Sequence, residues 1–172
     1  TGSDVLLHAL PIYHTHGLFV ATNIVLVSGS KIRFLKKFND DDVIVNLPYS
    51  TVMMGVPTFY TRLLSDSRFD RNITKHMRLF VSGSAPLLAE THFKFEERTG
   101  HRILERYGMT ETLMNTSNPV DGRRKSGSVG LPLQGISIRI SNPINEVGEL
   151  EIKGPNLCMG YWRKEEDSKQ SL

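Results

Sequence analysis

The sequence predicts an α/β protein, in which a mostly parallel sheet with flanking helices spans about residues 4–130 and a small antiparallel β-rich portion follows. Two patterns support this fold class. Apolar strand-like runs alternate with segments of helical spacing through the first part of the chain, as in βαβ units. After Gly135 the helical segments stop, and apolar and polar residues alternate strictly. We therefore divide the chain into an α/β subdomain at residues 1–130 and a β-rich portion at residues 131–172.

Three strand-and-helix units are predicted before residue 65. Each pairs a short apolar or alternating run with a segment whose apolar residues are spaced for a helix. The pairs, strand first, are Val5–Leu10 with Gly17–Val27, Lys31–Leu35 (half-buried) with Asp40–Leu47, and Thr51–Val56 with Thr58–Leu64. Three Asp residues begin the second helix, where acidic side chains suit the helix dipole, and Pro57 suits the first turn of the third.

A fourth unit begins at Arg78–Ser82, an apolar run typical of a buried strand. A Gly-Ser-Ala-Pro turn leads from it into a helix over Leu87–Thr99, with Pro86 near the first helical position and Gly100 as the cap. Extended structure returns at Arg102–Glu105. Ligands of open α/β sheets bind in loops beyond the carboxyl ends of the strands. The loops that matter here follow Leu10, Ser82 and Arg106.

The β-rich portion is predicted to be antiparallel. Ile136–Ile140 and Glu149–Ile152 alternate strictly between apolar and polar residues, which is typical of strands with one solvated face. Asn142-Pro143 and Gly154-Pro155 supply the predicted turns.

The composition excludes several classes of protein. With 39% hydrophobic and 23% charged residues it is typical of a globular domain, and 21 basic against 18 acidic residues leave too small an excess for a nucleic-acid groove. The longest apolar stretch, Leu18–Val27, is about half the roughly 20 residues of a membrane helix, so no membrane span is expected. The single cysteine, Cys158, cannot form an internal disulfide, which favours a reducing compartment.

Two histidines, His14 and His16, lie in the turn after the first predicted strand. A His-x-His pair could bind zinc, but further ligands with the usual spacing are missing. At the carboxyl end of a strand, the two imidazoles fit an anionic ligand better.

Two further segments combine small and polar residues. The turn Gly83–Ala85 would let backbone pack flat against a planar ligand, because no bulky side chain intervenes. The segment Tyr107–Thr112 offers an aromatic face, a glycine, a hydroxyl and a carboxylate, which could stack a base, approach a phosphate and hold Mg²⁺. The same segment could instead begin a helix, with Thr110 as the cap and Glu111 in the first turn.

Four motifs in this order resemble those of the acyl-adenylate-forming enzymes, the superfamily of acyl-CoA synthetases, adenylation domains and luciferases. They are Leu10-Pro-Ile-Tyr-His-Thr-His-Gly17, Val81-Ser-Gly-Ser-Ala-Pro-Leu87, Glu105-Arg-Tyr-Gly-Met-Thr-Glu-Thr112, and Gly148-Glu-Leu-Glu-Ile-Lys-Gly-Pro155 with Gly160-Tyr-Trp162. The resemblance runs from about Asp4 to the end of the chain. Within the superfamily, the first and third motifs look most like those of the malonyl-CoA synthetases.

The resemblance implies a two-step ligase that uses ATP, Mg²⁺ and coenzyme A. A carboxylate attacks the α-phosphorus of ATP and releases pyrophosphate, and the thiol of coenzyme A then captures the acyl-adenylate. By the same resemblance, the catalytic residues are His14, Thr110 and Glu111, of which Glu111 holds the magnesium ion. The implied nucleotide-binding residues are Gly83, Ser84, Ala85, Tyr107, Gly108 and Thr110, and the implied substrate-binding residues are His16, Ser84, Arg106 and Met109.

Arg106 precedes the tyrosine of the third motif, at a position that lies against the acyl group in this family. A guanidinium can take a carboxylate bidentately. Our hypothesis is that Arg106, with His16 beside it, grips the second, non-reacting carboxylate of malonate. The alternative is that Arg106 forms a surface ion pair with Glu105.

Parts of the family pattern do not occur in the sequence. These are the Ser/Thr/Gly-rich triphosphate loop, the ribose-binding Asp and the C-terminal domain with its adenylation lysine. We therefore expect the central portion of a longer ligase, inactive alone, whose partners are malonate, ATP, CoA and the missing domains of the parent chain. No nucleic-acid partner is expected. The expected location is cytoplasmic, or mitochondrial if the parent is eukaryotic.

Two other functions stay open at this stage. One is a ligase for methylmalonate or another short acid, which the volume of the pocket beside Arg106 would distinguish. The other is a non-catalytic, truncated nucleotide-binding module.

Overall fold

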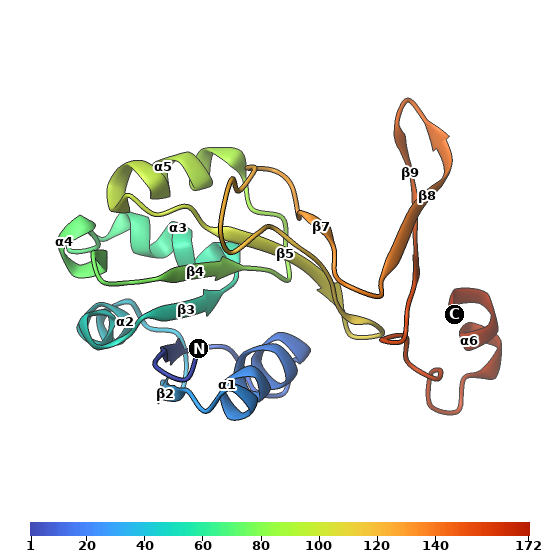
Figure 1. Cartoon of the computed structure of the whole chain (residues 1–172), viewed down its shortest axis with the longest axis horizontal. Helices are drawn as coiled ribbons and strands as arrows, with labels where there is room; N and C mark the ends of the chain where they lie inside the picture. The colour runs from blue at the N-terminus through green and yellow to red at the C-terminus, as the bar shows by residue number, and fades with distance from the viewer.

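A seven-stranded sheet forms the body of the computed structural model, which describes residues 1–172 (Figure 1). The strand order is β2-β1-β3-β4-β5-β6-β7; β1 to β5 pair in parallel, and β6 and β7 add antiparallel pairs. The strands are Val5–His8 (β1), Lys31–Phe34 (β2), Val52–Gly55 (β3), Leu79–Ser82 (β4), Leu104–Met109 (β5), Leu113–Ser117 (β6) and Leu131–Pro132 (β7). The predicted α/β class with a mostly parallel sheet is confirmed.

Helices connect the parallel strands as the sequence predicts, but the prediction of no helix after Gly135 is wrong, because a last helix at residues 165–171 follows the β-rich strands. They are η1 (His16–Thr22, a π-helix), α1 (Asn23–Ser28), α2 (Asp40–Asn46), η2 (Leu47–Tyr49, a 3₁₀-helix), α3 (Pro57–Ser65), α4 (Arg71–Thr74), α5 (Ala89–Thr99) and α6 (Glu165–Ser171). Pro57 stands in the first turn of α3, and Gly100 ends α5 with a φ of 79°. The predicted start of α5 at Leu87 is wrong by two residues, so Pro86 lies in the turn before the helix.

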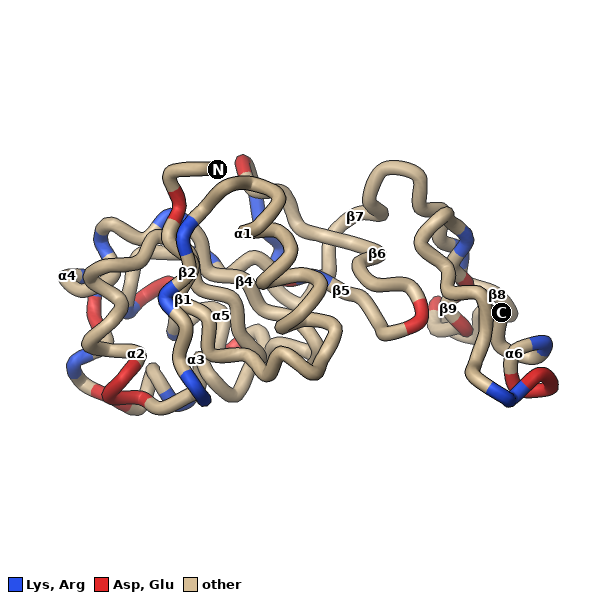
Figure 2. Tube along the Cα trace, turned by 90° about the horizontal axis from the view of Figure 1, so that it is seen from below, with Lys and Arg blue, Asp and Glu red and all other residues tan.

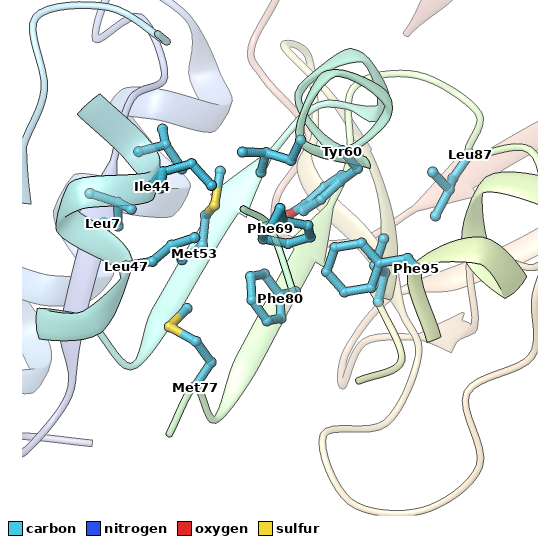
Figure 3. Close-up of a cluster of buried hydrophobic side chains, with 13 residues drawn as sticks. Leu7, Ile44, Leu47, Met53, Tyr60, Phe69, Met77, Phe80, Leu87 and Phe95 are labelled. Atoms are coloured by element: carbon cyan, nitrogen blue, oxygen red, sulfur yellow. The ribbon is translucent and has the colours of Figure 1, made fainter. Parts of the chain in front are cut away.

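The core lies on both faces of the sheet, because successive strand residues point to opposite sides. On one face, α2, α3 and α5 cover Leu7, Met53 and Phe80. Figure 3 shows the aromatic centre of this layer, where the rings of Phe80 and Phe95 lie 5.0 Å apart. On the other face, η1 and α1 cover the alternate residues, including Leu6, Val52, Leu79 and Val81. Strand β2 was predicted to be half-buried, but three of its four residues are exposed at the sheet edge.

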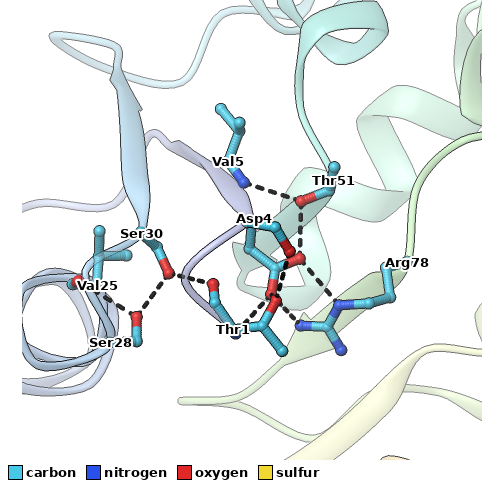
Figure 4. A network of polar contacts seen from close by, with 9 residues as sticks. Thr1, Asp4, Val5, Val25, Ser28, Ser30, Thr51 and Arg78 are labelled. Atoms are coloured by element: carbon cyan, nitrogen blue, oxygen red, sulfur yellow. Dashed lines mark hydrogen bonds and ion pairs between the residues drawn. The ribbon is translucent and has the colours of Figure 1, made fainter.

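A polar network ties together the amino ends of the central strands (Figure 4). Arg78, just before β4, donates through Nε and Nη2 to both carboxylate oxygens of Asp4, at 2.9 and 2.8 Å. Thr51, just before β3, donates to Asp4 at 2.9 Å and accepts from the Val5 amide at 2.9 Å. These bonds lower the pKa of Asp4 well below its ordinary value. Three strands are thus fixed at one end, which aligns their carboxyl ends at the other.

The segment after Arg106 differs from the prediction of a loop. Strand β5 runs on to Met109, and the turn 110–112 joins it to β6 as an antiparallel hairpin. The alternative of a helix beginning at Thr110 is also wrong. A bulge between Tyr107 and Gly108 bends the hairpin, and a Cβ atom on Gly108 would lie 1.9 Å from the carbonyl oxygen of Leu113. Only glycine fits there.

The β-rich portion is a two-stranded antiparallel hairpin of β8 (Ser137–Ile144) and β9 (Val147–Lys153), as predicted. It lies with α6 at the end of the molecule farthest from α4 (Figure 1). The predicted turn at Asn142-Pro143 is wrong: these residues lie within β8, and the chain reverses at Asn145 and Glu146, whose φ angles are 49° and 66°. Ile140 pairs with Leu150 on the apolar face.

Charged residues of both signs are interspersed along the chain in the α/β body and in the hairpin end (Figure 2). An acidic run, Asp40–Asp42, lies in the first turn of α2 and is met by arginines, with Arg62 2.7 Å from Asp40. None of the helices has the length and apolar character needed to cross a membrane.

Candidate adenylate and acyl pocket

A cavity of about 1080 Å³ opens at the carboxyl ends of β1, β4 and β5, where the sequence predicts a ligand. Five segments line it: the turn after β1, residues 34–38 at the end of β2 and beyond, the start of α3 with Val56 and Phe59, the turn after β4, and the β5–β6 hairpin. The candidate site residues that line the cavity are His14, His16, Gly83, Ser84, Arg106, Gly108, Met109 and Thr110.

Three candidate residues do not line the cavity: Ala85, Tyr107 and Glu111. Ala85 is exposed in the turn after β4. Tyr107 lies between Arg106 and Gly108 on β5, and its hydroxyl is 3.5 Å from the sulfur of Met109. Glu111 lies beside the cavity wall, next to Thr110. The structure therefore brings His14, Ser84 and Arg106 together and places the Glu111 carboxylate outside the wall that they form.

His16 is held against the turn that follows β4. Its Nδ1 atom lies 3.1 Å from the hydroxyl of Ser84, a residue with the left-handed φ of 67°. A Cβ atom on Gly83 would lie 3.4 Å from the ring, an ordinary contact distance, so the imidazole packs directly against this turn. Burial lowers the pKa of His16 to about 4, and the positive charge of Arg106 acts in the same direction. His16 is consequently neutral at pH 7.

Arg106 projects into the cavity from the middle of β5. Its Nε atom is buried without a hydrogen-bond partner, and the guanidinium forms no ion pair. Burial lowers the pKa of Arg106, but a guanidinium keeps its charge in proteins. The residue is half-buried, and a guanidinium that is partly removed from water without an anionic partner suits the cavity to a negatively charged ligand.

Glu105 is not the partner of Arg106, so that alternative is wrong. Adjacent strand residues point to opposite faces, and the Glu105 carboxylate is buried behind β5. There it lies 3.9 Å from Nδ1 of His92 and accepts a hydrogen bond from the Gly127 amide at 3.3 Å. Burial raises the pKa of Glu105.

His14 lies at the mouth of the cavity. Its side chain is exposed, and its ring packs on Tyr13 at 4.7 Å between centroids. No group of three or more His, Cys, Asp or Glu side chains is arranged to bind a metal ion. The pair His14 and His16 therefore has no third ligand of the zinc-binding types nearby.

Several contacts at the site were not predicted from the sequence. The Glu111 carboxylate accepts a hydrogen bond from the Tyr161 hydroxyl at 2.9 Å, and the Glu111 carbonyl accepts one from the Cys158 amide at 2.8 Å. Asn156 donates to Asn115 at 3.0 Å. The segment after β9 thus holds the β5–β6 turn in place. The Gly160-Tyr-Trp162 motif was the available signal, because it carries Tyr161.

Comparisons with known proteins agree with this geometry. Residues 1–162 match the family model described as AMP-binding enzyme. The chain is similar to a malonate–CoA ligase of Arabidopsis thaliana, at 39% identity over 100% of this chain and 32% of that protein. It is also similar to ATP-bound MatB from Rhodopseudomonas palustris, with a TM-score of 0.96 and 54% identity over 99% of this chain and 35% of that one.

A solved malonyl-CoA ligase with methylmalonyl-CoA and AMP bound is a further neighbour, with a TM-score of 0.91 and 36% identity over 100% of this chain and 39% of that one. The chain spans about a third of the length of the relatives that it matches. The shared third includes all of the segments that form the cavity.

Proposed function

The chain belongs to the AMP-binding enzyme family, and we propose that it supplies the acyl-adenylate pocket of a malonate–CoA ligase. In the proposed reaction, one carboxylate of malonate attacks the α-phosphorus of ATP, and pyrophosphate leaves. The thiol of CoA then attacks the acyl carbon of malonyl-adenylate and displaces AMP. The protein contributes by positioning the reactants and stabilising charge.

One observation carries the choice of malonate: Arg106 brings a cation without an anionic partner into the cavity. In the proposal, its planar donor fork binds the non-reacting carboxylate of malonate. His16 and Ser84 lie near Arg106 and are hydrogen-bonded to each other, so together they have one proton left to donate to the bound acid. A monocarboxylic acid with an apolar tail would enclose the guanidinium in the pocket without an anionic partner, so the same arrangement disfavours it.

The nucleotide occupies the neighbouring part of the pocket in this proposal. The backbone at Gly83, Ser84 and Ala85 packs against adenine, Tyr107 stacks on the base, and Gly108 allows close approach of the hairpin. Thr110 binds phosphate, Met109 contacts the acyl group, and His14 at the cavity mouth faces the reacting phosphate. These assignments extend the family resemblance to residues that line the cavity or adjoin it.

The residues also fit a magnesium ion at Glu111. Tyr161 donates to Oε1 of Glu111, and no protein group donates to Oε2 of that carboxylate. Magnesium beside a nucleotide is bound through one or two carboxylates, with phosphates and water supplying the other ligands. When bound, the ion neutralises charge on the phosphates. Glu111 would hold it, and Tyr161 would orient the carboxylate.

The complete enzyme, in this proposal, includes parts of the parent chain that bind the triphosphate and deliver the adenylation lysine. The single cysteine fits a cytoplasmic or mitochondrial location. A mouse malonate–CoA ligase described as mitochondrial is 35% identical over the whole of this chain.

A chimera provides the test. Residues 1–172 would replace the matching third of the Rhodopseudomonas palustris MatB chain, to which they are 54% identical. Malonate-dependent exchange of pyrophosphate into ATP is expected, and Arg106→Leu should lower kcat/KM for malonate by about 100-fold or more, because a buried charge that loses its partner costs about 3–5 kcal/mol. With butyrate the same substitution should lower kcat/KM by less than about threefold, since butyrate has no second carboxylate that would lose its partner.

Arg102→Leu is the matched control, because Arg102 is an arginine four residues away that pairs with Glu96 at 2.7 Å outside the cavity. This substitution should leave kcat/KM unchanged for both malonate and butyrate. Equal losses with malonate and butyrate in Arg106→Leu would contradict the assigned role. Pyrophosphate exchange with acetate but not with malonate in the unmutated chimera would contradict the assignment of malonate as the substrate. Methylmalonate belongs in the panel because a related ligase binds methylmalonyl-CoA.

A further inference from the structure

His8 is a buried histidine at the carboxyl end of β1 to which the proposed reaction gives no role. It is 1% exposed, and its Nε2 atom lies 3.0 Å from the carbonyl oxygen of Gly17 and 3.1 Å from the hydroxyl of Thr22. Thr22 donates to the same carbonyl at 2.8 Å. The three groups form a closed triangle beneath the turn that carries His14 and His16.

The protonation of this triangle follows from its chemistry. A carbonyl oxygen only accepts, so Nε2 of His8 carries the proton and donates to Gly17. Nδ1 then has a lone pair that is buried without a partner. The ring of Phe34, 5.0 Å from the imidazole, limits its rotation. His8 is therefore a neutral, fixed donor aimed at one backbone oxygen.

The carbonyl that His8 binds belongs to a π-helical turn, η1, which begins at His16. Such turns are rare and occur mostly as single-turn bulges at functional sites. Gly17 is also packed from the other side, because a Cβ atom on it would lie 2.1 Å from the Pro11 carbonyl oxygen. Any shift of Gly17 moves His16, which precedes it and contacts Ser84.

We propose that His8, together with Thr22, is a positioning residue that fixes the π-helical turn and so holds His16 against Ser84 in the acyl pocket. The role in substrate binding rests on the function proposed above. The role in fixing the turn rests on the hydrogen bonds alone. His8 touches neither the cavity nor any reacting atom, so it acts through Gly17 and His16.

The kinetic test uses the chimera with His8→Phe, which keeps an aromatic ring and removes the donor. KM for malonate is expected to rise about tenfold, while KM for ATP changes less than twofold. His8→Gln can place an amide N–H near the position of Nε2 and should restore KM for malonate to within about threefold. Thr22→Val should raise it two- to fivefold.

His101→Phe is the matched control. His101 is partly buried and, like His8, donates through Nε2 to a backbone carbonyl, that of Thr74 at 2.9 Å, but it does not line the cavity. It should lower Tm as His8→Phe does and leave KM for malonate unchanged. Equal rises in KM for malonate in the two variants would overturn the positioning role.

Hydrogen exchange on residues 1–172 separates this proposal from the function. His8→Phe should speed exchange of the backbone amides in segment 18–23 by at least tenfold, and His101→Phe should not. Unchanged exchange in His8→Phe would overturn the role of His8, whatever the substrate is. If the unmutated chimera ligates no malonate but exchange responds as expected, the proposed function fails and the fixed turn stands.

Discussion

His16 should make the stability of the protein depend on pH. Burial lowers the pKa of its imidazole to about 4, from an ordinary value of 6.5. The folded state thus binds a proton on His16 less readily than the unfolded state does. Stability is complete above the unfolded pKa and falls as the pH drops from 6.5 toward 4, because protonation draws the protein toward the unfolded state.

The size of the effect follows from the two pKa values. Lowering the pH from about 7.5 to about 5 should remove about 2 kcal/mol of unfolding free energy through His16, and the full loss by about pH 4 should reach about 3 kcal/mol. His8, His92 and Glu105 titrate with shifted pKa values in the same molecule. A variant that lacks only the His16 imidazole isolates its share.

Urea unfolding of the unmutated chain and of His16→Asn at several pH values is the assay. Asn keeps a polar group near Ser84 and does not titrate in this range. The unmutated chain should lose about 2 kcal/mol more than His16→Asn between pH 7.5 and pH 5, or roughly 1 M in urea midpoint at an m-value near 2 kcal/mol/M. Parallel pH profiles for the two proteins would refute the claim that His16 is buried neutral beside Arg106.

Two further predictions concern stability. Gly108→Ala should destabilise the chain by more than about 2 kcal/mol, because its Cβ atom would overlap the Leu113 carbonyl oxygen at 1.9 Å. Gly83→Ala, whose nearest contact is a side-chain atom at 3.4 Å, should cost less than about 1 kcal/mol; equal midpoints in urea for the two variants would contradict this reading of the bulge. Tyr60→Phe should cost about 1–2 kcal/mol, because it leaves the buried carbonyl of Val81 without its hydroxyl donor. Thermal unfolding checks it, and an unchanged Tm would contradict it.

The parallel part of the fold was predictable because its signals are local. Pro57 and Gly100 mark a helix start and a helix end, and both do so in the structure. The alternation of β8 and β9 likewise requires only neighbouring residues. The helix start was misplaced at Leu87 because a proline such as Pro86 fits the first turn of a helix as well as it fits the loop before one.

The β5–β6 hairpin was missed because its cause is non-local. Thr110 and Glu111 have the chemistry of a helix start, and nothing within that segment opposes a helix. The hairpin forms because residues after the turn pair with β5, so that the carbonyl of Leu113 comes against Gly108. The π-helical register of η1 is a similar case, because it depends on contacts that His8 makes from another element.

The candidate site was predictable to the extent that strand ends could be recognised. The turns after β1 and β4 were placed correctly, so His14, His16 and Ser84 meet in one cavity. Glu111 could not be placed, because Tyr161 lies 50 residues away and binds its carboxylate. An assignment of β5 through Met109 would have excluded the pair of Arg106 with Glu105, since neighbouring strand residues face opposite sides.

That alternation also explains how β5 can present a cation on one face and a carboxylate on the other. On one face of β5, Arg106 brings a cation to the cavity. On the other face, the Glu105 carboxylate binds the Gly127 amide, and its carbonyl binds Asn118, which together hold the connection 118–127 against the sheet. A register shift of one residue would exchange the two side chains and bring a carboxylate into the anion site. The bulge therefore has to come after both Glu105 and Arg106. A bulge placed before these two residues would turn each side chain to the other face of the sheet.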